Sequence, residues 1–151
     1  MNSLFKIITV LFIIWPYVSF GKDVLKAKEG ITWDSENKEY VAKGDVIYQS
    51  DEIKISSDFL RAKYEIKDER EVFNEIEVKG SIEIFYNDEI YYSDYGLYFK
   101  PKNLIELYDN VKIVSEERIL KGDKLIIDLK NNTRTMSASK KESVVEVFIN
   151  E

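Results

Sequence analysis

Three aspartates recur at one position of a repeated pattern and are candidates for acid–base chemistry: Asp58, Asp94 and Asp123. A general acid–base pair needs two carboxylates that face one cleft and have well-separated pKa values. These aspartates occur once per repeat, which is typical of a turn residue that hydrogen-bonds its own backbone. We therefore expect all three to have a structural role.

The residue types that are missing exclude most other site chemistry. The chain of 151 residues has no histidine and no cysteine, which excludes Ser-His-Asp catalysis, a thiol nucleophile, a disulfide and a cysteine-ligated zinc or iron–sulfur centre. It also lacks the Gly-x-x-x-x-Gly-Lys-[Ser/Thr] loop that binds nucleotide phosphates. Asn87, Asp88 and Glu89 carry oxygen atoms of the kind that calcium binds, but the segment offers too few such ligands for a good calcium site. We expect no enzymatic activity, no cofactor and no metal.

The composition indicates one folded, acidic domain. A chain of this length usually forms a single domain, and a hydrophobic content of 44% is enough for a core. The formal net charge of −6 argues against nucleic acid as a partner, because such a partner needs a basic surface that neutralises its phosphates.

The N-terminus has the pattern of an export signal. A single lysine precedes an apolar run from Ile7 to Tyr17, which is too short to span a bilayer as a helix. Ser19 and Gly21 then form a small-x-small site of the kind that signal peptidase cleaves. We expect residues 1–21 to be a signal peptide and residues 22–151 to form the domain. The alternative is an uncleaved anchor that keeps the apolar run in the membrane.

From Lys22 onward the sequence predicts strands. Apolar and polar residues alternate with period two, as in Glu75-Ile76-Glu77-Val78, and β-branched and aromatic residues dominate. Turn signals such as Asn87-Asp88 and Lys130-Asn131-Asn132 separate the alternating stretches. We therefore expect an all-β, antiparallel fold whose strands have one buried and one solvated face.

One spacing occurs three times in the domain: 14 residues separate Gly44 from Asp58, Gly80 from Asp94, and Asp109 from Asp123. The alternation keeps its parity across the first residue of each copy, so we expect one long strand that bends there. Glycine supplies such a bend in the first two copies. Because the third copy has Asp109 instead, we expect that a positive φ is not required at this position.

Copies of a bent strand cannot bury an apolar face singly, so they must align into an elongated antiparallel sheet that is folded over on itself. The interior of this sheet is then a continuous apolar trough. Its ends are open edges, which pair with another chain unless something blocks them. The stretch Tyr95–Phe99 shows no clear alternation, so the face on which each of its residues lies stays open.

The ordered set of motifs resembles the OstA/LptA family, which comprises periplasmic proteins of lipopolysaccharide export. The matching segments lie between Ile31 and Leu129 and are Ala42-Lys43-Gly44-Asp45-Val46, Ser57-Asp58, Val78-Lys79-Gly80-Ser81-Ile82, Ser93-Asp94-Tyr95-Gly96 and Gly122-Asp123-Lys124-Leu125. The resemblance implies an elongated, twisted, open β-jellyroll with a hydrophobic groove for lipid A acyl chains. The family's asparagine after the first glycine is replaced by Asp45 and Ser81 and is kept only as Asn110.

The resemblance also implies a set of lipid-binding residues, because in such a jellyroll the core and the groove are the same surface. From the residues alone, the same positions describe an ordinary hydrophobic core. They lie two and four residues before and after the first residue of each copy, and they are Tyr40, Ala42, Val46, Tyr48, Ile76, Val78, Ile82, Ile84, Ile105, Leu107, Val111 and Ile113.

Three further groups each have a functional and an ordinary interpretation. Tyr86, Tyr91, Tyr92, Tyr95 and Tyr98 form either a belt at the groove mouth or a stretch of ordinary strand aromatics. Basic residues either meet lipid A phosphates or belong to a mixed solvated face, and they are Lys43, Lys54, Arg61, Lys63 and Lys79. Finally, Val145, Val147 and Ile149 lie on a terminal strand that either completes the sheet or docks a partner.

The predicted function is that of a non-enzymatic periplasmic carrier, which shields lipopolysaccharide acyl chains during transfer from the inner to the outer membrane. The implied partners are lipopolysaccharide, an inner-membrane LptC-like protein, an outer-membrane LptD-like translocon, and further copies of this chain arranged head to tail. Two alternatives remain: a membrane-anchored LptC-like component of the same export system, and an exported structural or sugar-binding β-repeat protein.

Overall fold

The computed structural model describes residues 22–150, which form ten strands in one antiparallel sheet. The strands are β1 (Val24–Lys26), β2 (Gly30–Asp34), β3 (Glu39–Gln49), β4 (Lys54–Lys67), β5 (Arg70–Tyr86), β6 (Glu89–Phe99), β7 (Leu104–Val114), β8 (Arg118–Asp128), β9 (Thr133–Ser137) and β10 (Glu146–Ile149). A short 3-10 turn, η1 (Lys100–Lys102), joins β6 to β7. The predicted signal peptide lies outside the described residues.

The strand order across the sheet is β1-β3-β4-β5-β6-β7-β8-β10. At one end, β3 pairs with β2 along its first half and with β1 along its second half. At the other end, β8 pairs with β10 along its first half and with β9 along its second half. In the described part of the chain, no helix has the length and apolar character needed to cross a membrane.

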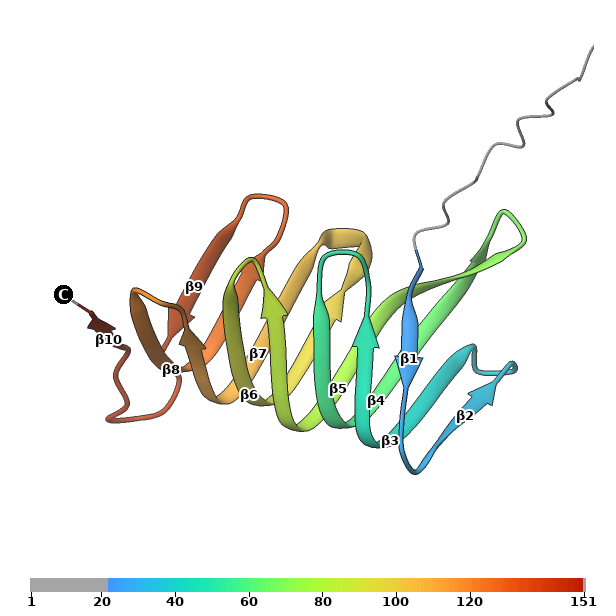
Figure 1. The fold of residues 1–151 in the computed structure, drawn as a ribbon, viewed down its shortest axis with the longest axis horizontal. Coiled ribbons are helices and arrows are strands. Elements are labelled where there is room, and N and C mark those ends of the chain that lie inside the picture. The colour runs from blue at the N-terminus through green and yellow to red at the C-terminus, as the bar shows by residue number, and fades with distance from the viewer. Residues whose placement is uncertain (1–21, 151) are drawn as a thin grey trace, which may run out of the picture.

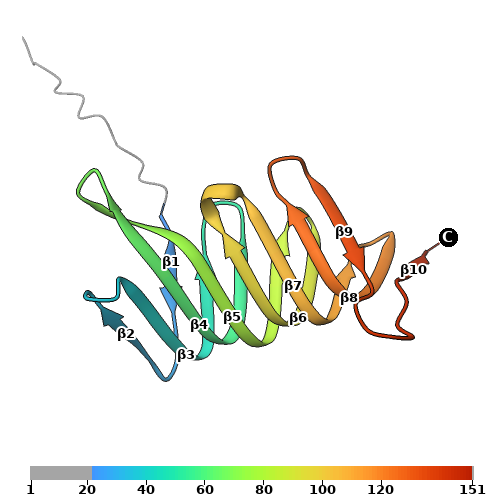
Figure 2. The ribbon, with the colours of Figure 1, turned by 180° about the vertical axis from the view of Figure 1, so that it is seen from behind.

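The long strands bend near their middles, so the sheet is folded over along its long axis into two facing walls (Figure 1; Figure 2). Wall A consists of β2, β9 and residues 39–43, 59–67, 70–79, 95–99, 104–108 and 124–128. Wall B consists of β1, β10 and residues 46–49, 54–57, 82–86, 89–93, 111–114 and 118–122. The walls join at the line of bends, and we call the opposite side, where the hairpins of both walls end, the mouth.

Each bend in β3, β5 and β7 is made by two consecutive residues in the left-handed region. The pairs are Gly44 (φ 78°) with Asp45 (41°), Gly80 (78°) with Ser81 (46°), and Asp109 (64°) with Asn110 (51°). The register of the sheet shifts at each pair, as in a β-bulge. The prediction of one long bent strand per copy is confirmed.

The expectation that the third copy does not need a positive φ is wrong, because Asp109 has a φ of 64°. Aspartate and asparagine are the residues other than glycine that adopt this conformation most readily. Asp109 and Asn110 therefore build the same bend without glycine.

The strand register aligns the inward side chains in rows that run along the long axis. In wall B, the row nearer the mouth contains Tyr48, Ile55, Ile84, Tyr91, Ile113 and Leu120. In wall A, the corresponding row contains Tyr40, Ala62, Ile76, Tyr98, Ile105, Ile127 and Arg134. The rows nearer the bends include Val46, Ile82 and Val111 in wall B, and Ala42, Leu60, Val78, Leu107 and Leu125 in wall A.

The structure determines the faces within Tyr95–Phe99. Gly96 and Tyr98 are inward and buried, whereas Tyr95, Leu97 and Phe99 are half-buried on the other face. A β-carbon at Gly96 would lie 2.9 Å from Leu107 Cδ2 and 3.0 Å from Val78 Cγ2. Gly96 thus leaves space inside the fold that its two neighbours fill.

Candidate lipid-binding interior

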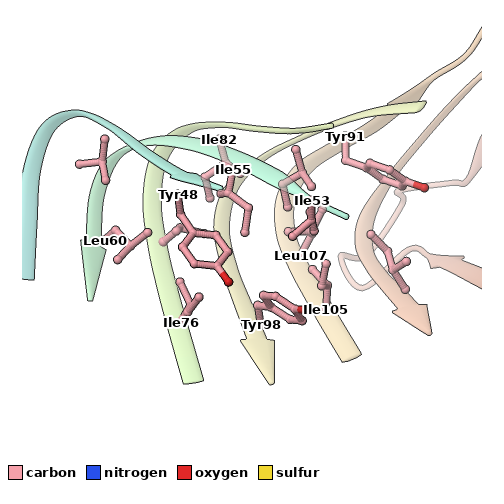
Figure 3. Packing of buried hydrophobic residues seen from close by; sticks show 14 of the residues in the cluster. Tyr48, Ile53, Ile55, Leu60, Ile76, Ile82, Tyr91, Tyr98, Ile105 and Leu107 are labelled. Carbon is pink, nitrogen blue, oxygen red and sulfur yellow. The ribbon is translucent and has the colours of Figure 1, made fainter. Parts of the chain in front are cut away.

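The residues predicted to bind lipid all lie on the inner faces of the two walls. Tyr40 is half-buried, and each of the other eleven is at most 3% exposed. Figure 3 shows side chains of this cluster from several strands gathered in the space between the walls. The period-two alternation therefore predicted correctly which positions come together.

Residues outside the predicted set complete the interior. Leu60, Ala62, Leu125 and Ile127 are fully or almost fully buried in the same cluster. They were not predicted, because the predicted positions lie only along the bent strands β3, β5 and β7. Leu125 and Ile127 alternate after Asp123, so their own period was the available signal.

Little polar chemistry is present between the walls. Ser57 and Ser93 are buried, and their hydroxyls donate to the carbonyls of Phe59 (3.0 Å) and Tyr95 (3.2 Å). Both bonds stay within one strand, at its bend. The rest of the buried cluster is aliphatic or aromatic, as in a site that accepts apolar chains.

The mouth carries a polar cluster near β1. Asp23 directly precedes β1 in wall B, whereas Lys100 starts η1 at the margin of wall A. Lys100 Nζ lies 2.5 Å from Asp23 Oδ2 and donates to the Tyr48 hydroxyl at 3.0 Å. The Tyr48 hydroxyl in turn donates to Asp23 Oδ1 at 3.1 Å. We call Asp23, Tyr48 and Lys100 the first mouth cluster.

A second cluster, which also joins a carboxylate, a tyrosine and a cation, lies farther along the mouth. Arg134, on β9 of wall A, lies with its Nε 2.8 Å from Glu89 Oε2 and 2.9 Å from the Tyr91 hydroxyl. The Tyr91 hydroxyl also donates to Glu89 Oε2. Glu89 and Tyr91 both lie on β6 of wall B. We call Glu89, Tyr91 and Arg134 the second mouth cluster.

Burial and hydrogen bonds shift the pKa values of three groups in these clusters. Burial is the main cause that raises the pKa of Tyr48 and that of Tyr91 well above the ordinary tyrosine value. Burial alone would lower the pKa of Arg134, but its bonds to Tyr91 and Glu89 outweigh this and raise it. Both tyrosines are therefore neutral hydroxyl donors to a carboxylate, and Arg134 is a permanent cation.

A scan against protein families matches residues 26–133 to the family described as LptA/(LptD N-terminal domain) LPS transport protein. The chain belongs to this family. The crystal structure of LptH, the LptA homologous periplasmic component of the conserved lipopolysaccharide transport device from Pseudomonas aeruginosa, is similar with a TM-score of 0.76. The identity is 15%, over 87% of this chain and 96% of LptH, so this likeness shows the fold. Comparison with curated proteins gives no significant match.

The recognition of the OstA/LptA family and the predicted open antiparallel β-jellyroll are thus confirmed. In this LptA-family protein, the five clustered tyrosines do not form one belt. Tyr91 and Tyr98 are buried on the inner faces, whereas Tyr92 and Tyr95 are half-buried on the outer face. The ordinary alternation of a strand explains their arrangement better than a belt does.

The basic residues considered for lipid A phosphates lie away from the interior of this LptA-family protein. Lys63 pairs with Glu75 at 3.1 Å, and Glu77 pairs with Arg61 at 3.3 Å and with Lys79 at 3.4 Å. These residues form a mixed charged face on the outer side of the sheet. Lys100 and Arg134, two cations that reach the mouth, were not identified from the sequence.

The three repeated aspartates lie along the line of bends. Asp94 accepts a hydrogen bond from Asn110 Nδ2 at 2.6 Å. Asp123 accepts from the backbone N–H groups of Ser139 (2.9 Å) and Lys140 (3.2 Å). This placement fits the expected structural role, although the bonds go to neighbouring segments and not to the aspartates' own backbone.

No group of three acidic, histidine or cysteine side chains within residues 22–150 is arranged to hold a metal ion. In the oxygen-rich segment Asn87-Asp88-Glu89, Asn87 and Asp88 form the β5–β6 turn at positive φ, and Glu89 begins β6. The carboxylate of Glu89 points to Tyr91 and Arg134.

Proposed function

We propose that this LptA-family protein is a non-enzymatic periplasmic carrier that shields the acyl chains of lipopolysaccharide during transfer from the inner to the outer membrane. The observation that carries the proposal is the apolar interior, which runs through every long strand from β3 to β8. An acyl chain needs no catalytic group for such binding. It needs only an apolar surface, which lowers its free energy by about 0.8 kcal/mol per buried methylene.

The periplasmic location rests on the family and on the N-terminal sequence. The family comprises lipopolysaccharide transport proteins, and the similar LptH is named as a periplasmic component. We propose that residues 1–21 direct export and are removed after Gly21, so that the exported protein begins at Lys22. The intact mass of the protein purified from the periplasm tests this directly. Retention of residues 1–21 would favour the anchored, LptC-like alternative.

Site-specific photo-crosslinking in cells tests the carrier function. Ile84 is 1% exposed on the inner face of β5, and its neighbour Glu83 lies on the outer face. A photoreactive residue at position 84 is expected to form a lipopolysaccharide adduct, whereas the same residue at position 83 is expected to form none. Adducts at neither position would contradict the carrier function and favour a purely structural β-repeat protein.

We further propose that the two ends of the sheet dock partners. Val145, Val147 and Ile149 are exposed at the β10 end, and Ile31 and Trp33 are exposed on β2 at the other end. Exposed apolar side chains beside an edge strand favour pairing with another chain. The partners would be further copies of this protein, an LptC-like protein at the inner membrane and an LptD-like translocon at the outer membrane.

A further inference from the structure

The interior is closed in the structure described here. Side chains of the two walls fill the space between them, as the very low exposure of the inner residues shows. Because protein interiors are close-packed, an acyl chain cannot be added without moving side chains or backbone. If acyl chains lie between the walls, the walls must therefore move apart, and the contacts that cross the mouth must break.

The two mouth clusters are polar contacts of this kind. In each, the cation comes from wall A or from the turn at its margin, and the tyrosine and the carboxylate come from wall B or from the residue that directly precedes it. Tyr48 and Tyr91 occupy the same inward row of wall B. Lys100 Nζ lies 5.7 Å from the centre of the Tyr48 ring, and the Arg134 guanidinium lies at the same distance from the Tyr86 ring.

These two ion pairs differ from the others in the described part of the chain. The side chains of Lys100 and Asp23 are 21% and 27% exposed, and those of Arg134 and Glu89 are 17% and 15% exposed. In each of the other ion pairs at least one side chain is 39% or more exposed. Pairs on the outer face, such as Lys63–Glu75, also join residues of one wall. A half-buried ion pair with an additional hydroxyl partner is stronger than a surface pair. The two mouth pairs can therefore hold the walls together.

We propose that the two mouth clusters are clasps that keep the interior closed, and that Lys100 and Arg134 bind the phosphate groups of the incoming lipid when the clasps open. This inference rests on the proposed function. The phosphates take the positions of the carboxylates of Asp23 and Glu89, which pass into water as the walls separate. The contacts of Lys100 and Arg134 with the carboxylates and those with the phosphates are both charge-assisted hydrogen bonds. Each ion pair that is lost on opening is therefore replaced by a contact with the lipid.

The position of the cations gives the reason for assigning them to phosphate. When the acyl chains of an amphiphile lie between the walls, its charged headgroup must stay at the boundary with water, which is the mouth. Lys100 and Arg134 are cations of the mouth that contact tyrosines of the inner face, Lys100 at Tyr48 and Arg134 at Tyr91. The guanidinium fork also matches the geometry of a phosphate better than that of a single oxygen.

Reversible cross-linking tests the clasps. The chain has no cysteine, so the pairs Asp23→Cys/Lys100→Cys and Glu89→Cys/Arg134→Cys can each be joined by a short bis-methanethiosulfonate reagent and released with dithiothreitol. The matched control is Lys63→Cys/Glu75→Cys, which joins two strands of the same wall. The measurement is the affinity for fluorescent bisphosphorylated lipid A, before and after release.

We expect each cross-link across the mouth to lower the affinity at least about tenfold and release to restore it, whereas the control changes little. Equal affinity of the cross-linked and released forms would overturn the clasp proposal alone. If the unmodified protein binds no lipid, the carrier function fails together with the clasps.

Charge variants test the phosphate assignment. Lys100→Gln/Arg134→Gln is expected to weaken binding of bisphosphorylated lipid A about tenfold relative to binding of dephosphorylated lipid A, because only the bisphosphorylated lipid loses charged hydrogen bonds. Binding of dephosphorylated lipid A should not weaken, because the variant also breaks both clasps. The matched variant Asp23→Asn/Glu89→Gln is expected to bind bisphosphorylated lipid A more tightly, since it frees both cations. Equal losses for the two lipids in Lys100→Gln/Arg134→Gln would overturn the assignment.

Discussion

The carboxylate of Asp58, on β4, lies against Gly80 at the bend of β5, so that a β-carbon at Gly80 would overlap Asp58 Oδ2. Gly80 also has a φ of 78°, which side chains rarely tolerate. The bend of β5 thus favours glycine for two separate reasons, which are the backbone conformation and the close approach of the neighbouring aspartate.

Gly80→Ala is expected to lower the free energy of unfolding by about 1–3 kcal/mol, as strain at a positive φ adds to the overlap with Asp58. Urea denaturation measures the change. Adding Asp58→Ala should restore the part of the lost unfolding free energy that is due to the overlap. The part that is due to the backbone conformation should remain lost. A Gly80→Ala protein as stable as the wild type would contradict both reasons.

Ser81→Asn is expected to stabilise the fold by about 0.5 kcal/mol, because asparagine tolerates the left-handed conformation better than serine does. Ser81 is exposed and has a φ of 46°, so the change acts mainly on the backbone. Thermal unfolding measures the gain. Ser56→Asn, in an extended part of β4, is the control and should bring no gain; an equal gain at both positions would point to another cause.

Asp123→Ala is expected to loosen the segment that leads to β10. The Asp123 carboxylate accepts hydrogen bonds from the Ser143 hydroxyl and from the N–H groups of Ser139 and Lys140, and these bonds lower the pKa of Asp123. Hydrogen exchange should become faster in β10. Asp128→Ala is the control, because Asp128 holds Asn131 in the β8–β9 turn and should affect only that turn.

The same bonds predict an effect of acid on β10. Because the pKa of Asp123 is lower in the folded protein, its contribution is present above the ordinary aspartate value and is lost as the pH falls through the folded pKa. Exchange in β10 of the wild type should therefore rise at acid pH toward that of Asp123→Ala. An acid response that Asp123→Ala shares unchanged would contradict this account.

Stability is expected to fall between about pH 10 and pH 12, in part through Tyr98. Burial is the main cause that raises its pKa to about 12. The neutral hydroxyl is favoured in the folded state, so its contribution is complete below pH 10 and is lost as the pH rises toward 12. Tyr98→Phe should reduce the slope of stability against pH in this window. Tyr92→Phe, on the outer face, serves as the control and should reduce it less.

Val147→Lys and Trp33→Lys are each expected to weaken head-to-tail self-association, because they place a charge beside opposite ends of the sheet. Val147 is 53% exposed on β10 and Trp33 is 59% exposed on β2. Light scattering across a concentration series measures the oligomer. Phe85→Lys replaces an exposed apolar residue away from both edges and is the control. An equal effect of all three variants would indicate general solubility in place of edge docking.

Local features of the sequence were sufficient for the strands, the bends and the inner residues. Period-two alternation places Ile76, Val78, Ile82 and Ile84 on one face of a strand, whatever lies opposite them. Gly80 marks a bend because its backbone freedom is a property of the residue itself. The family recognition rested on the same local motifs, and their order and spacing were enough to find it.

Only the tertiary structure decided how the two walls meet. Asp23 and Lys100 are 77 residues apart, and Glu89 and Arg134 are 45 residues apart, yet each pair joins across the mouth. Such contacts depend on strand register and on how far the walls approach, which no local pattern encodes. The inward face of Gly96 and the left-handed conformation of Asp109 were likewise set by the strands packed around them.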